Sequence, residues 1–165
     1  MFLFVVNREK VSLNYNFIQN WKIPFNAVSG QNKTKEEDVL FTLYIPGINL
    51  EEKVYTMDSD KNHVDYHVQI LDGSDINKNF LFLAAHSGIG KASYFNRLVE
   101  LGVGDIIWID KGYEKKYFMV ESLFYITKNG YLEYSTLEIQ NKLYLFTCSL
   151  EYLDKQYVVI ASLVD

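Results

Sequence analysis

The sequence of 165 residues contains one cysteine, two prolines and two arginines. A single cysteine can form no internal disulfide and cannot build a thiolate zinc cluster, so Cys148 serves either packing or reactivity. The apolar run at residues 1–6 is followed by polar residues and is far shorter than the roughly 20 apolar residues that span a bilayer. We therefore expect no membrane-spanning segment and no complete signal peptide in this sequence.

Acidic residues outnumber basic ones in the sequence. The formal net charge is −5 and the isoelectric point is about 5.2. Nucleic-acid binding normally needs a basic face, so this class of partner is disfavoured. With 48% apolar residues, the chain is long enough for one domain with a substantial core. The 13 tyrosines and 11 phenylalanines favour strands.

The pattern along the chain predicts an all-β domain over residues 39–165, preceded by an N-terminal extension at 1–38 that ends in a polar, solvated stretch. Strands are predicted at residues 39–45, 53–57, 80–85, 105–109, 116–126, 142–148 and 156–164. Two short helices are predicted at residues 63–71 and 93–101. Many short strands separated by turn signals, such as Lys111-Gly112 and Asn129-Gly130, indicate a barrel or a sandwich.

Two reactive side chains stand at the ends of two apolar strands. Cys148 ends the run at 142–148, and His86 follows the run at 80–85. A thiol is mostly protonated at neutral pH, so an imidazole that shares its proton turns it into a useful nucleophile. Such partners meet in space rather than along the chain. The sequence therefore predicts a cysteine nucleophile with a histidine partner, whereas packing alone is the alternative reading of each residue.

Five fragments, in order and at similar spacing, resemble the sortase family over roughly residues 39–164. They are Ile45-Pro-Gly-Ile48, Leu83-Ala-Ala-His-Ser-Gly88, Ser93-Tyr-Phe-Asn-Arg-Leu98, Gly104-Asp105 and Leu145-Phe-Thr-Cys148. The resemblance implies a closed eight-stranded β-barrel with short helices, in which histidine and cysteine flank a groove on one face.

The same resemblance implies a reaction. Cys148 would attack the Thr–Gly bond of a sorting signal similar to Leu-Pro-x-Thr-Gly, and His86 would protonate the departing amine. The resulting thioacyl enzyme would pass the protein to an amine of a cell-wall precursor. The implied location is the outer face of the membrane of a Gram-positive bacterium, with association through an anchor that is not in this sequence. No cofactor is implied, although some family members use calcium.

The sequence departs from the family at its third catalytic position, where the last strand begins with arginine. Gln156 stands there, and Arg97 lies within a fragment that has its own counterpart in the family. A glutamine amide donates a hydrogen bond to an oxyanion but brings no charge. We expect slower catalysis, since a lost oxyanion donor typically costs about 10²- to 10³-fold. Strand alternation directs the adjacent Lys155 to the opposite face.

The residues flanking the pair are expected to shape the substrate groove; they are Ala85, Ser87, Thr147 and Ser149. Two alternatives remain. The chain could be a catalytically weakened or inactive barrel that binds sorting-like peptides, or a hydrolase that passes the cut peptide to water. Both prolines follow isoleucine, so the Asp-Pro-aromatic lid motif of pilin-type sortases is absent, and a compact anchoring sortase is the nearest subclass.

Other candidate sites are weaker. His63 and His67 have the spacing of a helical metal pair, but the glutamate of the zincin pattern is missing. The segment 88–91 lacks two residues of a phosphate loop and is predicted to be the turn after the histidine strand. The acidic clusters at 36–38 and 72–75 lack the spacing of a calcium loop. No metal site is therefore predicted.

Overall fold

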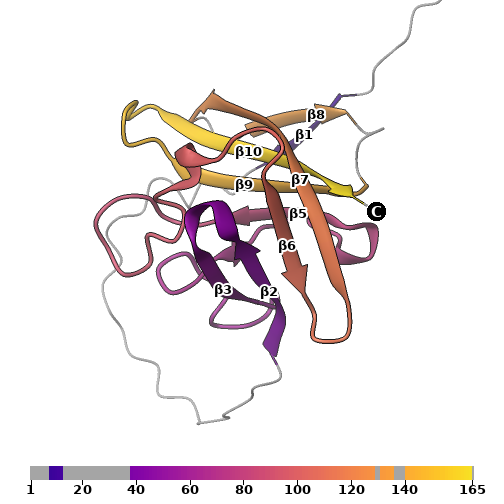
Figure 1. Ribbon diagram of the computed structural model, residues 1–165. Helices are drawn as coiled ribbons and strands as arrows, with labels where there is room; N and C mark the ends of the chain where they lie inside the picture. Colours follow the sequence, from indigo (N-terminus) through magenta and orange to yellow (C-terminus); the bar gives the residue numbers. More distant parts are fainter. Residues whose placement is uncertain (1–7, 13–37, 129–130, 136–139, 165) are drawn as a thin grey trace, which may run out of the picture.

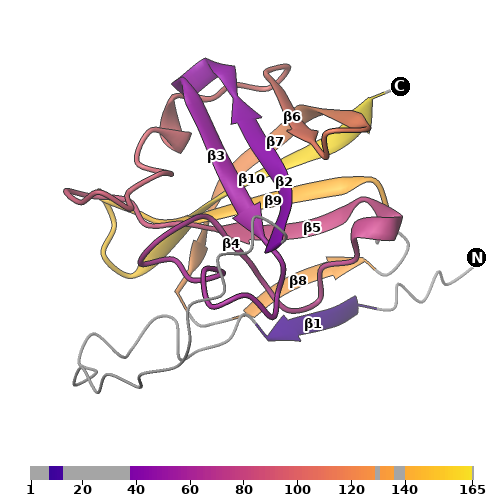
Figure 2. The same cartoon turned by 90° about the horizontal axis from the view of Figure 1, so that it is seen from below.

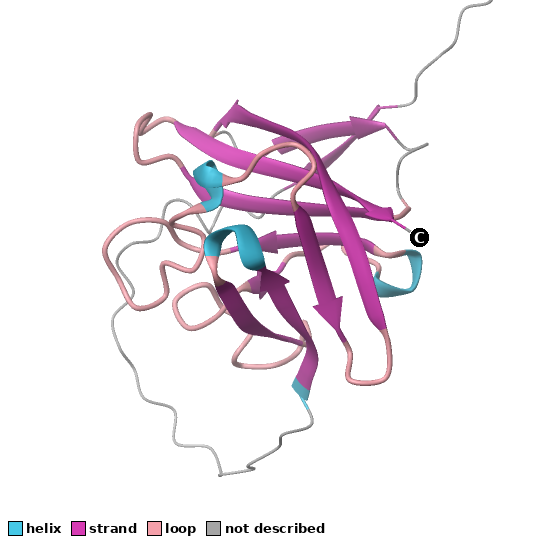
Figure 3. Cartoon of the chain, viewed as in Figure 1, coloured by secondary structure: helices cyan, strands magenta, loops and turns pink. Residues whose placement is uncertain are grey.

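The computed structural model describes residues 8–12, 38–128, 131–135 and 140–164. Strands dominate, and the helical segments are single short turns (Figure 3). In chain order the elements are β1 (Arg8–Ser12), β2 (Val39–Ile45), η2 (Pro46–Ile48), β3 (Leu50–Tyr55), β4 (Gln69–Ile70), η3 (Ile76–Lys78), β5 (Phe80–Ala84), η4 (Leu98–Glu100), β6 (Ile106–Asp110), β7 (Lys115–Thr127), β8 (Tyr131–Ser135), β9 (Lys142–Cys148) and β10 (Lys155–Val164). The described residues include no helix long and apolar enough to cross a bilayer.

Eight strands form a nearly closed barrel in the order β3-β2-β6-β7-β10-β9-β5-β4 (Figure 1). Neighbouring strands are antiparallel except for β5 and β9, which run parallel. A parallel bridge between Val54 and Val68 links the two ends of the order. The predicted all-β barrel with short helices is confirmed. β1 and β8 form a separate two-stranded sheet, which lies on the side of β5 away from β2 and β3 (Figure 2).

The sheet of β5, β9 and β10 separates two apolar clusters. The inner cluster fills the barrel and takes alternate residues such as Leu81, Leu143 and Val159. The outer cluster lies on the opposite face and contains Phe82 and Tyr144. Because both faces are covered, β5 and β9 are continuous apolar runs without alternation. The runs at 80–85 and 142–148 were recognisable as strands for this reason.

Most predicted strands are confirmed, with shifts at their ends. β2 and β9 have the predicted bounds, whereas β3 begins at Leu50, three residues before the predicted start. The Lys111-Gly112 turn joins β6 to β7, with Gly112 at a φ of +85° and its N–H donated to Asp110 Oδ1. The Asn129-Gly130 turn and residues 29–37 of the predicted solvated stretch lie outside the described residues.

Neither predicted helix forms over its full length. Residues 63–67 form one turn, closed by a bond from the His67 N–H to the His63 carbonyl, and β4 follows. The helical spacing of Val64 and Val68 misled, because Val64 belongs to the outer cluster and Val68 to the inner one. Residues 93–101 form successive turns and the short η4.

Candidate active site

The parallel pairing of β5 and β9 sets the positions of the predicted histidine and cysteine. The register pairs Ala84 with Phe146, so the next two residues on each strand lead to His86 and Cys148. Side-chain bonds continue the pairing beyond the ladder. Thr147 Oγ1 donates to the Ala85 carbonyl at 2.9 Å, and Ser87 Oγ donates to the Cys148 carbonyl at 2.6 Å. The structure therefore brings His86 and Cys148 to neighbouring positions at the same end of two adjacent strands.

The third predicted residue lies on the next strand. Gln156 pairs directly with Cys148 across the antiparallel β9–β10 ladder, and opposite residues in such a ladder share a face. Gln156 is only 3% exposed, and its buried Oε1 has no hydrogen-bond partner among the described residues. A buried amide oxygen without a partner costs free energy, so this amide is open to a further hydrogen bond.

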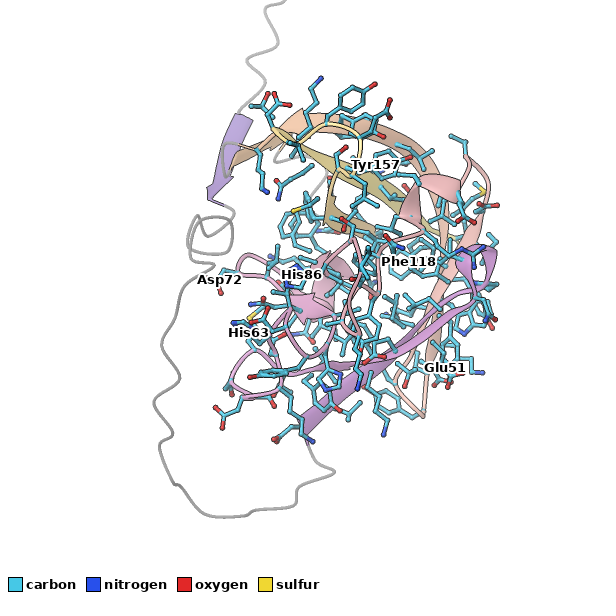
Figure 4. The ribbon with its side chains drawn as sticks, turned by 90° about the vertical axis from the view of Figure 1, so that its left-hand side faces the viewer. Glu51, His63, Asp72, His86, Phe118 and Tyr157 are labelled. Atoms are coloured by element: carbon cyan, nitrogen blue, oxygen red, sulfur yellow. The ribbon has the colours of Figure 1, made fainter. Side chains whose placement is uncertain are left out.

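Strand alternation puts all three residues on the outer face. Phe146 and Ala84, two positions before Cys148 and His86, belong to the outer cluster, as does Val158, two positions after Gln156. The imidazole is 28% exposed and the cysteine is partly buried. A thiol, an imidazole and an amide thus gather where the apolar outer face meets solvent. Figure 4 labels His86, which is partly exposed, and Phe118, which is fully buried.

A carboxylate that the sequence did not single out also reaches this group. Asp65, in the turn before β4, lies with its Oδ1 2.9 Å from His86 Nε2. The two residues are 21 positions apart, and the segment containing Asp65 was predicted to be helical. No spacing pattern in the sequence connects them.

The flanking residues differ in what they present. Ala85 and Thr147 are buried, and the hydrogen bond from Thr147 to the Ala85 carbonyl joins the two strands. Ser149 is buried as well, and its Oγ accepts from the N–H groups of Glu151 and Tyr152, which fixes the turn after the cysteine. Ser87 is partly exposed but engaged with the Cys148 carbonyl. All four hold the strand ends around the reactive pair.

Arg97 and Lys155, the two basic residues considered in relation to the missing arginine, make other contacts. Arg97 donates to the Ile48 carbonyl and to Glu100, and the hydrogen bond to Glu100 raises the pKa of the guanidinium. Lys155 lies over the Tyr152 ring at 5.2 Å. Neither contact involves the three site residues.

The structure also shows what the side chains of the weaker candidate sites contact, as far as those residues are described. His67 Nδ1 lies 2.7 Å from Glu52 Oε1, and the ring packs on Tyr55. Asp75 accepts the N–H groups of Asn77 and Lys78 at the start of η3. Among the described residues no group of three or more histidine, cysteine or acidic side chains could hold a metal ion. Gly88, at a φ of +116°, begins the turn after the histidine.

The chain was compared with protein-family models, curated sequences and solved structures. A family model described as the Sortase domain matches residues 43–164, while no curated protein sequence matches. The fold is similar to sortase C of Streptococcus pneumoniae, with a TM-score of 0.64 and 20% identity over 79% of this chain and 71% of that chain. It is also similar to a lid mutant of sortase A from Corynebacterium diphtheriae, with a TM-score of 0.65 and 20% identity, over 80% of this chain and 73% of that chain. Sortase C-1 from Actinomyces oris gives a TM-score of 0.64 and 18% identity, over 79% of this chain and 76% of that chain.

Proposed function

Because the chain belongs to the sortase family, we propose that it is a cysteine transpeptidase that cleaves a Leu-Pro-x-Thr-Gly-like sorting signal between threonine and glycine. The observation that supports this most directly is the strand register, in which the ends of β5 and β9 are joined by the bond from Ser87 to the Cys148 carbonyl. A nucleophile and an acid/base on adjacent strand ends can reach one scissile bond.

In the first step Cys148 Sγ attacks the threonine carbonyl, and a carbon–sulfur bond forms. The carbon–nitrogen bond then breaks, and His86 gives its proton to the departing glycine amine. An amide nitrogen leaves poorly without that proton, whereas a thiolate needs no further base. In the second step an incoming amine loses a proton to His86, attacks the thioester and releases the cysteine.

Gln156 is proposed to face the reacting carbonyl. Its amide sits opposite Cys148 and is 3% exposed, so a hydrogen bond to the oxyanion would form with little competition from water. The unpaired Oε1 offers a further acceptor for a substrate N–H. The amide brings no charge, which is why we expect this enzyme to be slower than relatives with arginine at this position.

The proposed partners are a protein carrying a C-terminal sorting signal and an amine of a cell-wall precursor, at the surface of a Gram-positive bacterium. Ala85, Ser87, Thr147 and Ser149 shape the site by holding the strand ends. No cofactor is needed, because both steps use only the thiol, the imidazole and the amide.

One observation favours a second candidate, a non-catalytic barrel that binds sorting-like peptides. An uncharged, buried glutamine where the family has arginine fits a chain that has lost catalysis and kept the groove. A hydrolase that transfers the acyl group to water is the third possibility, and it shares the first chemical step.

Mass spectrometry after incubation with a Leu-Pro-x-Thr-Gly peptide separates these functions. The parent protein should gain the mass of the acyl fragment, and Cys148→Ala should gain nothing. Added amine should then convert the adduct into a transfer product. An intact bound peptide would support the binder, and a free acid in the presence of amine would support the hydrolase.

A further inference from the structure

The contact between Asp65 and His86 gives the site a fourth polar member. The 2.9 Å separation of Asp65 Oδ1 and His86 Nε2 is that of a hydrogen bond in which a ring N–H donates to a carboxylate. An imidazole has two nitrogens, and the one that donates to the carboxylate fixes the tautomer of the neutral ring.

Asp65 is held in place from both sides. Val64 is buried in the outer cluster, and the Tyr66 carbonyl accepts from Tyr94 Oη at 3.0 Å. Burial raises the pKa of Tyr94, so this hydroxyl stays a neutral donor at physiological pH. Tyr94 itself directly precedes Phe95, whose N–H bonds to the His86 carbonyl. The turn that carries Asp65 is thus tied to the segment that carries His86.

His63 is the other histidine near this carboxylate, and Figure 4 shows it on the same side of the molecule as His86. Its Nδ1 lies 3.6 Å from Asp65 Oδ2, but the same nitrogen accepts the Asp65 backbone N–H at 3.2 Å. A nitrogen that accepts that bond carries no proton to donate. The carboxylate therefore remains available to His86.

We propose that Asp65 is a positioning residue that holds the His86 imidazole through Nε2 and so fixes the orientation in which the ring passes its proton to the departing amine. This inference rests on the proposed transpeptidase function. Asp65 is 61% exposed, and exposed ion pairs contribute little to stability. Its removal should therefore change turnover and leave the melting temperature nearly unaltered.

The test compares Asp65→Asn and Asp65→Ala with the parent, using Asp58→Asn, an exposed position in the same loop, as the matched control. We expect kcat for the amide peptide to fall by about 10-fold or more in Asp65→Ala with little change in KM, because orientation is lost and not binding. Asp65→Asn should retain part of the rate, since its amide oxygen can still accept from Nε2. The control should match the parent.

The nitrogen-15 spectrum of His86 in its neutral form gives a readout that does not depend on turnover. In the parent the proton should reside on Nε2, and in Asp65→Ala it should distribute between the two nitrogens. An unchanged tautomer in Asp65→Ala would overturn the inference, whatever happens to kcat. If the parent shows no acylation but has the expected tautomer, the proposed function fails while the positioning contact stands.

Discussion

The outer face of β9 carries polar side chains at both ends, about 20 Å apart along six residues of strand. At the first end Lys142 Nζ bonds to both Glu121 and Ser162, and Ser162 also donates to Glu121. At the other end Gln156 lies opposite Cys148, and its Oε1 has no hydrogen-bond partner in the part of the chain that the structure describes. Polar groups at the first end satisfy one another, while the second end keeps hydrogen-bonding capacity in reserve. This unpaired oxygen is open to a new hydrogen bond, which is why the proposed mechanism uses Gln156.

Among the changes at the Cys148 end of β9, removing the His86 imidazole should cause the largest loss of activity. His86→Ala is expected to lower amide cleavage by about 10²- to 10⁴-fold, the usual contribution of a general acid or base. A peptide with an ester in place of the Thr–Gly amide should lose much less, because an alkoxide leaves with less need of a proton. Acylation rates for the two peptides check this.

His67→Ala is the matched control for that experiment, since His67 is engaged with Glu52 and Tyr55. It should leave both acylation rates unchanged. Equal losses for amide and ester in His86→Ala would contradict the role of His86 as the acid.

Replacing the buried amide should move activity and stability in opposite directions. Gln156→Leu removes an unpaired oxygen and keeps the volume, so the free energy of unfolding should rise by up to about 1–3 kcal/mol. Acylation should fall by about 10²- to 10³-fold, because an oxyanion donor is lost. Denaturant unfolding and single-turnover acylation measure the two quantities.

Gln69 provides the comparison, since its Oε1 is the other buried amide oxygen without a partner among the described residues. Gln69→Leu should also raise stability but leave acylation at the parent rate. A Gln156→Leu variant as active as the parent would remove Gln156 from the proposed mechanism.

The strand ends that carry the candidate site were largely predictable from the sequence. Apolar runs at 80–85 and 142–148 indicated two apolar strands, and both strands form with nearly the predicted bounds. β3 was less well placed because its first half carries Glu51 and Glu52, which do not alternate with core residues. Single positions that pack into different clusters, such as Val64 and Val68, produced a false helical period.

The sequence could not predict contacts between segments that are distant along the chain and meet only in the folded structure. Asp65 lies in a turn whose position depends on Tyr94 and on the burial of Val64, and neither contact leaves a spacing signal. The unpaired state of Gln156 depends in the same way on everything that surrounds its amide. Reserve capacity is a property of the assembled structure, so the prediction of Gln156 rested on the family resemblance alone.

A substitution at the Lys142 end of β9, where the polar groups bond to one another, should have the smallest effect. It should change stability and leave activity unaltered. Burial of the Glu121 carboxyl opposes its ionisation, but hydrogen bonds from Lys142 and Ser162 hold its pKa below the ordinary value of 4.5. A lowered pKa in the folded protein contributes stability above pH 4.5 that is lost as the pH falls through the folded value. Because Glu121 is 39% exposed, solvent screens this contribution to at most about 1 kcal/mol. Glu121→Gln should therefore lose less stability than the parent between pH 7 and pH 3.

Denaturant unfolding at the two pH values isolates this contribution, because Asp75 and Asp110, whose pKa values are also lowered, are present in both proteins. Asp75 and Asp110 should thus cancel in the difference between parent and variant. Acylation at pH 7 should be the same in both, since Glu121 belongs to the cluster at the far end of β9 from Cys148. A loss of acylation in Glu121→Gln would mean that the two ends are coupled through the aromatic cluster between them. The distinction between a satisfied end and a reserve end would then fail, and the whole outer face would have to be treated as one functional unit.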